Sequence, residues 1–144
     1  MKHALGSLLF PLRRIRPRDL GRAGETRGAW FYRWRGYSIL ERNLRFGDGE
    51  IDLVVRRRRT LAFVEIKTRQ TKDHGAPQDA VDRRKQLQIA RLAQRFLQTR
   101  ELEGIDTVRF DVLSLFWNRG RFEIEWFPGA FVLESDSERP WRTK

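Results

Sequence analysis

The feature that most constrains the fold is the stretch from residue 49 to residue 69, in which two apolar segments of alternating pattern flank four consecutive arginines. Side chains two residues apart share one face of a strand. On the first strand the pattern predicts one face with Glu50, Asp52 and Val54 and another with Ile51, Leu53 and Val55. On the second strand it predicts one face with Leu61, Phe63, Glu65 and Lys67 and another with Ala62, Val64 and Ile66. The stretch therefore predicts a β-hairpin with charged groups inside apolar strands.

Asp52, Glu65 and Lys67 are the charged side chains that need an explanation. Burying a charge is unfavourable unless a partner or a cation compensates it. Hairpin pairing would bring Asp52 and Glu65 onto strands roughly 4.8 Å apart, close enough to bind one ion. Two carboxylates suit Mg²⁺ or Mn²⁺ better than zinc, which prefers His or Cys. The alternatives are a structural salt bridge from Lys67 to Glu65 or Asp52, and exposure of this face at a strand end.

The rest of the chain predicts a single mixed α/β domain. Around the hairpin we expect a helix over residues 20–36, a strand over 37–46, a helix over 77–99, and strands over 107–117 and 121–127. The order α-β-β-β-α-β-β predicts an antiparallel meander, a crossover helix that returns a strand beside it, and helices packed on the sheet. Residues 1–19 are expected to be a basic flexible tail, residues 20–131 the domain, and residues 132–144 a polar tail.

The first predicted helix has two candidate inner faces. Asp19 is its expected N-cap, and Gly36 its expected end. One face combines Tyr32 with three glycines, Gly21, Gly24 and Gly28. Glycine inside a helix is unfavourable by up to about 1 kcal/mol relative to Ala, so this face predicts close approach to the sheet. That approach would carry Glu25 toward Asp52 and Glu65; the alternative is a flexible segment with an exposed Glu25.

The other face of this helix is an apolar stripe that includes Trp30, Phe31 and Trp34. If the glycine face is buried, the N-terminal tail, the C-terminal segment or another subunit has to cover this stripe. On the second helix, Lys85 interrupts an apolar stripe. It either reaches solvent along its stem or pairs with a site carboxylate or a phosphate. Asp111, between two apolar residues of a strand, is expected to be structural and paired with an arginine.

Charge predicts an anionic partner. The formal net charge is +11, and nucleic acid is the commonest partner of a compact basic domain. Because only 5 of the 30 basic residues are Lys, GC-rich coding offers a competing explanation. The hairpin tip, residues 56–59, is either a solvated loop or a phosphate-binding one. The chain has no Cys, which excludes disulfides and thiolate zinc sites. It also has no apolar run long enough to span a membrane, so we expect a cytoplasmic protein.

Asp52 followed by Glu65-Ile66-Lys67 resembles the D…(D/E)-x-K signature of restriction-endonuclease-like nucleases. The wider string is more specific. It comprises Gly21-x-x-Gly24-Glu25, Gly36-Tyr37-x-Ile39-Leu40-x-Arg42-Asn43, Gly49-Glu50-Ile51-Asp52-Leu53, Phe63-Val64-Glu65-Ile66-Lys67-Thr68-Arg69, Ala80-Val81 and Lys85. Over residues 20–131 it resembles the YraN family, small bacterial proteins similar to archaeal Holliday-junction resolvases. It departs from that pattern at Gly28, where Ala is expected.

The resemblance implies a restriction-endonuclease-like three-layer core and a metal-dependent endonuclease acting on branched or single-stranded DNA. Asp52, Glu65 and Glu25 would hold Mg²⁺ or Mn²⁺, and Lys67 would complete the catalytic set. The residues expected to bind nucleic acid are Arg42, Arg56, Arg57, Arg58, Arg59, Arg69 and Lys85. Two alternatives stay open: a nucleic-acid-binding module without turnover, and an interaction protein that assembles, as a homodimer for example, through the aromatic stripe.

Overall fold

The computed structural model describes residues 16–47, 49–70 and 81–131. The elements are α1 (Pro17–Trp34), β1 (Ser38–Phe46), β2 (Gly49–Arg57), β3 (Thr60–Arg69), α2 (Arg83–Thr99), β4 (Thr107–Asn118) and β5 (Arg121–Phe127). This confirms the predicted order α-β-β-β-α-β-β. Residues 1–15 of the predicted N-terminal tail and the whole predicted C-terminal tail lie outside the described residues.

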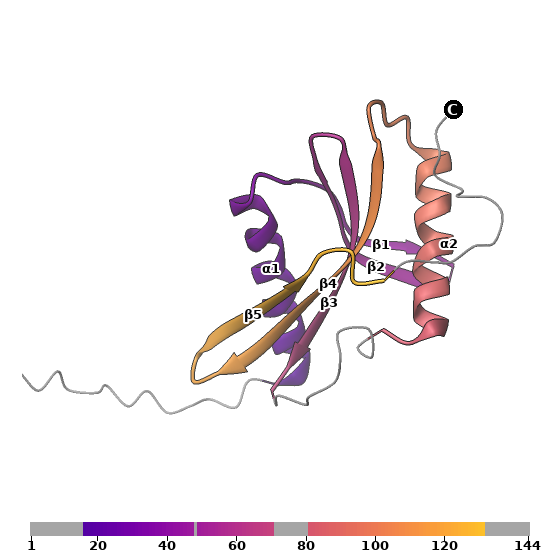
Figure 1. Ribbon diagram of the computed structural model, residues 1–144. Coiled ribbons are helices and arrows are strands. Elements are labelled where there is room, and N and C mark those ends of the chain that lie inside the picture. Colours follow the sequence, from indigo (N-terminus) through magenta and orange to yellow (C-terminus); the bar gives the residue numbers. More distant parts are fainter. Residues whose placement is uncertain (1–15, 48, 71–80, 132–144) are drawn as a thin grey trace, which may run out of the picture.

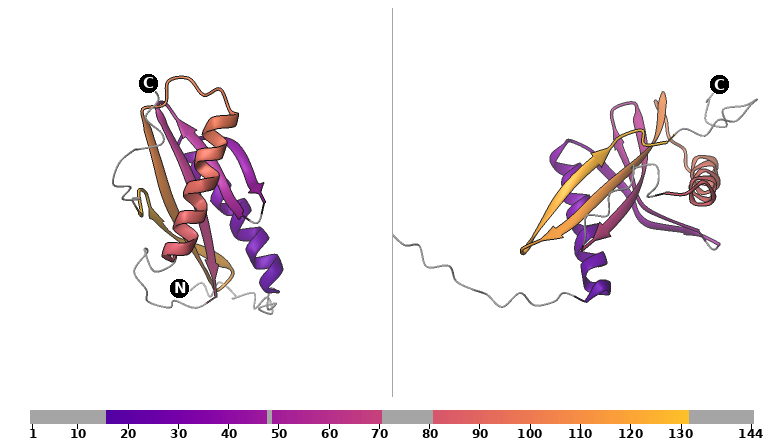
Figure 2. Two further views of the ribbon diagram at one scale, coloured as in Figure 1. Left: turned by 90° about the vertical axis from the view of Figure 1, so that its right-hand side faces the viewer. Right: turned by 60° about the horizontal axis from the view of Figure 1, so that its bottom comes forward.

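The strands form one five-stranded sheet in the order β1-β2-β3-β4-β5. β3 and β4 pair in parallel, and the other neighbours are antiparallel. α1 and α2 lie on opposite sides of the sheet (Figure 1), and α2 crosses the strands in the left view of Figure 2. Each helix has its own apolar core, the α2-side core around Phe63 and Phe96 and the α1-side core around Tyr32 and Leu113. Within the described part of the chain, neither helix is long and apolar enough to cross a lipid bilayer.

Both helices begin at residues other than those the sequence predicted. α1 begins three residues early, because Pro17 stands at its first turn and Arg16, not Asp19, is the N-cap residue. Proline suits this position, since its fixed φ is helical and its missing N–H has no helical partner there. The predicted end is confirmed, with Gly36 at φ +81°.

α2 begins at Arg83, and Asp82 is its N-cap, accepting a 2.8 Å hydrogen bond from the backbone N–H of Lys85. The predicted start at residue 77 is therefore wrong in that residues 81 and 82 are not helical, while residues 77–80 lie outside the described residues. A side-chain cap at Asp82 satisfies a free N–H of the first turn, so the helix can begin there.

The glycine face of α1 packs directly on β3. A Cβ at Gly28 would stand 2.7 Å from the Cδ1 of Ile66, and a Cβ at Gly24 would overlap the side chain of Thr68. Close approach is therefore confirmed for these two glycines. It does not extend to Gly21, where a Cβ would meet nothing within 4 Å. The contact places the middle of α1, including Glu25, against the end of β3.

β2 leaves β3 partway along its length. Its pairing with β3 runs from Arg57 back to Leu53, opposite Val64, whereas its pairing with β1 continues as far as Gly49. In Figure 1, β1 and β2 accordingly turn toward α2, and β3 continues beside β4. The sheet therefore forks between β2 and β3 immediately next to Asp52.

Side-chain alternation breaks at the same level. Ile51 and Val54 both belong to the α2-side core, although an unbroken strand would place Ile51 with Leu53. The predicted face of Ile51 is therefore wrong, because β2 turns with β1 at the fork. Arg42 pairs with Leu53 and Leu44 with Ile51, so Asn43 lies opposite Asp52, and it has φ +50°. A left-handed residue inside a strand bends and twists the local ladder.

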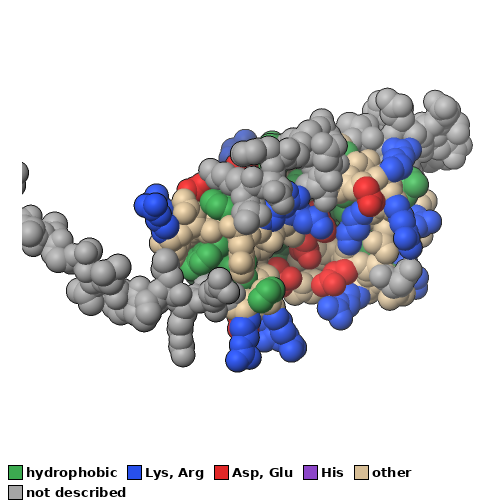
Figure 3. Space-filling model, turned by 90° about the horizontal axis from the view of Figure 1, so that it is seen from below, with side chains coloured by type: hydrophobic (Ala, Val, Ile, Leu, Met, Phe, Trp, Pro, Cys, Tyr) green, Lys and Arg blue, Asp and Glu red, His purple; other side chains and the backbone are tan. Residues whose placement is uncertain are grey.

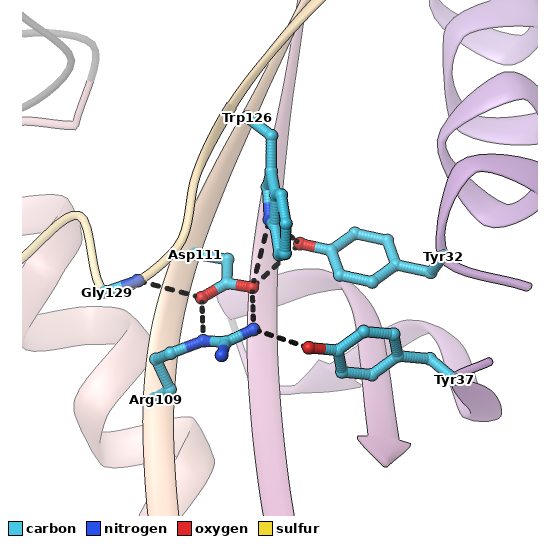
Figure 4. Close-up of polar contacts among 6 residues, drawn as sticks. All are labelled: Tyr32, Tyr37, Arg109, Asp111, Trp126 and Gly129. Carbon is cyan, nitrogen blue, oxygen red and sulfur yellow. Dashed lines mark hydrogen bonds and ion pairs between the residues drawn. The ribbon is translucent and has the colours of Figure 1, made fainter. Parts of the chain in front are cut away.

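Asp111 on β4 is fully buried and held by a dense polar network on the α1 side (Figure 4). Arg109 forms a two-point ion pair with it, at 2.7 and 2.9 Å. Tyr32 donates at 2.9 Å, and the Gly129 backbone N–H donates at 3.0 Å. This confirms the structural role predicted for Asp111 and the pairing with an arginine. Burial, with the charge of Asp111 beside it, raises the pKa of Tyr32.

The predicted aromatic stripe of α1 divides into two parts. Phe31 is buried and makes an edge contact with Trp126 of β5, with ring centroids 5.6 Å apart. Trp30 and Trp34 are 50% and 79% exposed. The prediction of one continuous stripe is therefore wrong for Phe31, because β5 covers that side of the helix.

Candidate metal and nucleic-acid site

Asp52 lies at the fork, where its side chain accepts a hydrogen bond that a backbone carbonyl would accept in a continuous sheet. Its Oδ2 accepts a 2.7 Å hydrogen bond from the backbone N–H of Ile66 on β3. Leu53 and Val64 are the last paired residues of β2 and β3, and Asp52 and Glu65 are their direct neighbours in the sequence. The structure thus brings these two carboxylates onto neighbouring strands at the point where the strands separate.

The electrostatics of the fork disfavour a charged Asp52 in the absence of a cation. Burial raises the pKa of the Asp52 carboxyl, and the negative charge of Glu65 raises it further, to about 7. The Ile66 hydrogen bond lowers it, while Glu25 and Glu50 each raise it. A divalent cation would reverse this balance by stabilising the ionised form. Two carboxylates in one partly buried place thus form an environment that favours a positive charge.

Glu65 lies between two lysines. Its side chain is 8% exposed, with the Nζ of Lys67 at 3.3 Å and the Nζ of Lys85 at 4.0 Å from Oε1. Of the two interpretations of Lys85, the structure therefore favours pairing with a site carboxylate. The ion pair of Lys67 with Glu65 is the one that the structural interpretation predicts. Both lysines keep about a third of their side chains exposed and accessible to a phosphate.

Glu25 and Glu50 complete the acidic surroundings of Asp52. Glu25 arrives on α1, which the Gly24 contact holds against Thr68. Glu50 lies on β2 with the Nη2 of Arg45 at 3.5 Å. Across residues 16–47, 49–70 and 81–131, however, no three acidic or His side chains converge as a metal-binding group. The described site therefore consists of a pair of carboxylates, with Glu25 close enough to act on Asp52 by charge.

Acidic and basic side chains lie near one another on the described surface. Viewed from below, acidic side chains gather near the middle of the molecule, with Lys and Arg side chains around them (Figure 3). Arg42 on β1 is exposed and pairs with Leu53, beside Asp52 in the sheet. Arg69 ends β3, two residues after Lys67. Of the residues expected to bind nucleic acid, Arg42, Arg69 and Lys85 thus lie on the part of the fold that carries the carboxylates.

The hairpin tip lies at the opposite end of β2 and β3 from the fork (Figure 1). Two of its arginines bind the connection between α2 and β4: Arg56 donates to the backbone carbonyl of Glu103 at 2.7 Å, and Arg59 forms an ion pair with Asp106. Arg57 and Arg58 are exposed. The structure therefore gives Arg56 and Arg59 a packing role and separates the whole tip from the carboxylates.

Sequence reasoning did not assign a role to Glu50 or Asn43. Glu50 lies two residues before Asp52, and that spacing was the available signal, because it predicted a shared face. For Asn43 the signal was weaker. Asn adopts positive φ more readily than most residues, but it stands in a segment that otherwise alternates like a regular strand.

With the geometry described, the chain can be compared with known proteins. The model of a family described as "Uncharacterised protein family UPF0102" matches residues 24–115, a segment that contains Glu25, Asp52, Glu65 and Lys67. The chain belongs to the UPF0102 family. This confirms the membership that its sequence strings predicted.

Other UPF0102 proteins align over most of the chain. A UPF0102 protein of Syntrophotalea carbinolica is 47% identical over 116 residues, covering 81% of this chain and 94% of the relative. One of Prosthecochloris aestuarii is 43% identical, covering 82% and 97%. Among solved structures, Pyrococcus furiosus SfsA in complex with Ca²⁺ is similar over 76% of this chain and 62% of that one, with 16% identity and a TM-score of 0.31.

Proposed function

We propose that this protein is a metal-dependent endonuclease that hydrolyses phosphodiester bonds in branched or single-stranded DNA, in the cytoplasm. The observation that carries the proposal is the fork, where Asp52 and Glu65 meet beside Lys67. A protein that only binds nucleic acid has no use for converging carboxylates, because they repel phosphate. The D…E-x-K pattern identified in the sequence occupies this one place.

Mg²⁺ or Mn²⁺ fits the donors available in the fork. Both carboxylates supply hard oxygen ligands, and water would complete the coordination shell. Asp52 and Glu65 would bind the ion directly, and Glu25, which acts on Asp52 through space, would contribute through water. When bound, the ion supplies charge stabilisation at the phosphoryl oxygens and a more acidic water.

The basic residues around the carboxylates would have two roles, in catalysis and in phosphate binding. Lys67, at 3.3 Å from Glu65, would orient the attacking water or stabilise negative charge that develops on the phosphoryl group. Lys85 and Arg42 would hold the neighbouring phosphates. Such contacts give affinity that depends on salt and little on sequence. Selectivity would then come from the shape of the DNA.

DNA cleavage tests the proposal. Purified protein is incubated with branched, single-stranded and duplex DNA, in the presence of Mg²⁺, Mn²⁺ or chelator. We expect cleavage that requires metal and is lost in Asp52→Asn and Lys67→Ala while DNA binding survives. Glu103→Gln, an exposed acidic residue at the far end of the sheet, is the matched control and should cleave normally.

Two results would contradict the proposal, and each favours a different alternative. DNA binding without cleavage under any metal favours a non-catalytic binding module on the same fold. The absence of both binding and cleavage favours an interaction protein.

A further inference from the structure

The exposed end of α1 carries two tryptophans that the core does not use. Trp30 and Trp34 are 50% and 79% exposed, although the same helix buries Phe31 and Tyr32. They lie one turn apart and are therefore neighbours on the helix surface. Arg27 precedes Trp30 by three residues, and Arg33 follows it by three, with its guanidinium 5.8 Å from the Trp30 ring centroid. We refer to Arg27, Trp30, Arg33 and Trp34 as the tryptophan face.

The charge of this surface indicates the chemistry of its partner. Residues 26–35 contain three arginines and no acidic residue. Large aromatic rings between guanidinium groups suit a ligand that has both flat apolar faces and negative charge. The bases and phosphates of a single strand provide this combination, because every base can stack on an aromatic ring while arginines contact the backbone. Bases in a duplex are already stacked and are not available to these rings.

The tryptophan face is a separate surface from the carboxylate site. Glu25, whose charge acts on Asp52, lies five residues before Trp30 on the same helix, so the two side chains point about 140° apart around the helix axis. A strand can therefore contact the tryptophans without contacting the carboxylates. We propose that the tryptophan face binds single-stranded nucleic acid by base stacking, with its arginines contacting the phosphates. This inference rests on the proposed function for the identity of the strand, but its stacking contact can be measured without cleavage.

The test is the affinity for a short fluorescein-labelled oligothymidylate, measured by fluorescence anisotropy in chelator so that cleavage does not contribute. We expect Trp34→Ala and Trp30→Ala each to weaken binding by about tenfold, and Trp34→Phe to retain most of the affinity because it keeps a ring. Duplex affinity should change less. Leu87→Ala removes an exposed apolar side chain of α2, 43% exposed, and is the matched control. It should bind like the wild type.

The inference is overturned if the Trp30→Ala/Trp34→Ala double variant binds the oligonucleotide as the wild type does, or if the wild type does not bind it. A double variant that loses self-association or binding to anionic vesicles but keeps oligonucleotide affinity would assign the face to a second copy or to a lipid surface. Failure of the proposed function gives a different result. In that case the tryptophan variants still lose affinity in chelator, although the wild type cleaves no DNA with any metal.

Discussion

Two aspartates on the same sheet, Asp111 and the partly buried Asp52, lie in opposite electrostatic environments. Asp111 on β4 accepts hydrogen bonds from Arg109, Tyr32 and the Gly129 backbone, and it forms an ion pair with the guanidinium of Arg109. Asp52 accepts one backbone hydrogen bond in the described part of the chain, and burial, together with the charge of its carboxylate neighbours, raises its pKa to about 7. The first arrangement is complete without any ligand. In the second, burial and neighbouring charges disfavour the ionised form of the carboxyl group.

The two arrangements are also close neighbours in the sheet. Asp111 pairs with Val64, the residue before Glu65, so the two acidic groups belong to consecutive levels of β3 and β4. Tyr32 of α1 contacts Asp111, whereas Lys85 of α2 contacts Glu65, which places the groups on opposite faces. On the α1 face, the carboxylate at this level is therefore held by donors from α1, β4 and Gly129, whereas on the α2 face it lies between two partly exposed lysines.

The largest effect on stability is expected at Asp111. Asp111→Ala leaves the charge of Arg109 and the hydroxyl of Tyr32 without their buried partner, and should lower the free energy of unfolding by about 3–5 kcal/mol. Asp106→Ala is the control, because it breaks an exposed aspartate–arginine pair, with Arg59, and should change stability by less than about 1 kcal/mol. Urea denaturation measures both. If the free energy of unfolding falls by a similarly small amount in both variants, the buried Asp111 network is no more stabilising than an exposed ion pair.

An intermediate effect, of opposite sign, is expected at Asp52. A carboxyl whose pKa is raised by folding, here from 3.8 to about 7, binds more protons in the folded protein than in the unfolded one between these values. Stability of the metal-free protein should therefore fall as pH rises through this range. Asp52→Asn retains an acceptor for Ile66 and removes the charge. The pKa difference of about three units, at about 1.4 kcal/mol each, sets a ceiling of about 4 kcal/mol for the stabilisation above pH 7. Because the amide still has to be partly buried, we expect roughly 2–3 kcal/mol.

The pH profile of unfolding checks this expectation. Near the lower end of the range, wild type and Asp52→Asn should have nearly equal stability, because Asp52 is then protonated in the folded protein. A destabilised variant above pH 7 would show that Asp52 makes a net structural contribution, as Asp111 does.

The smallest effect is expected at Asn43, which lies opposite Asp52 at the fork. Asn43→Val forces a β-branched residue to φ +50° and should lower stability by about 1–2 kcal/mol, whereas Asn43→Gly should be nearly neutral. Thermal unfolding of the two variants provides the comparison. If valine is accepted as well as glycine, the left-handed residue does not shape the fork.

The hairpin and the element order could be predicted from the sequence because alternation and turn residues are local signals. The fork could not be predicted, because it forms where β2 stays paired with β1 and separates from β3. This tertiary arrangement places Ile51 in the α2-side core. The start of α1 was missed because Pro17 at the first turn outweighed Asp19 as a capping residue. Trp126 covers Phe31 although the two residues lie far apart in sequence, so no local pattern could predict their contact.

Within the candidate site, the meeting of Asp52 with Glu65 followed from hairpin register alone. The register did not show which of the arginines expected to bind nucleic acid would instead contact other parts of the protein. The tip arginines looked equivalent in sequence, yet Arg56 and Arg59 bind the α2–β4 connection. Partners in a loop more than 40 residues away decide such roles.

The most direct measurement of the central claim is a Mn²⁺ titration of the metal-free protein, with free Mn²⁺ followed by electron paramagnetic resonance. We predict saturable binding above pH 7 that is lost in Asp52→Asn and in Glu65→Gln and that weakens as pH falls below the pKa of Asp52. Asp106→Asn, at the other end of the sheet, should bind Mn²⁺ like the wild type. An absence of binding by the wild type, or binding that survives in both site variants, would contradict the claim that the fork is a cation site.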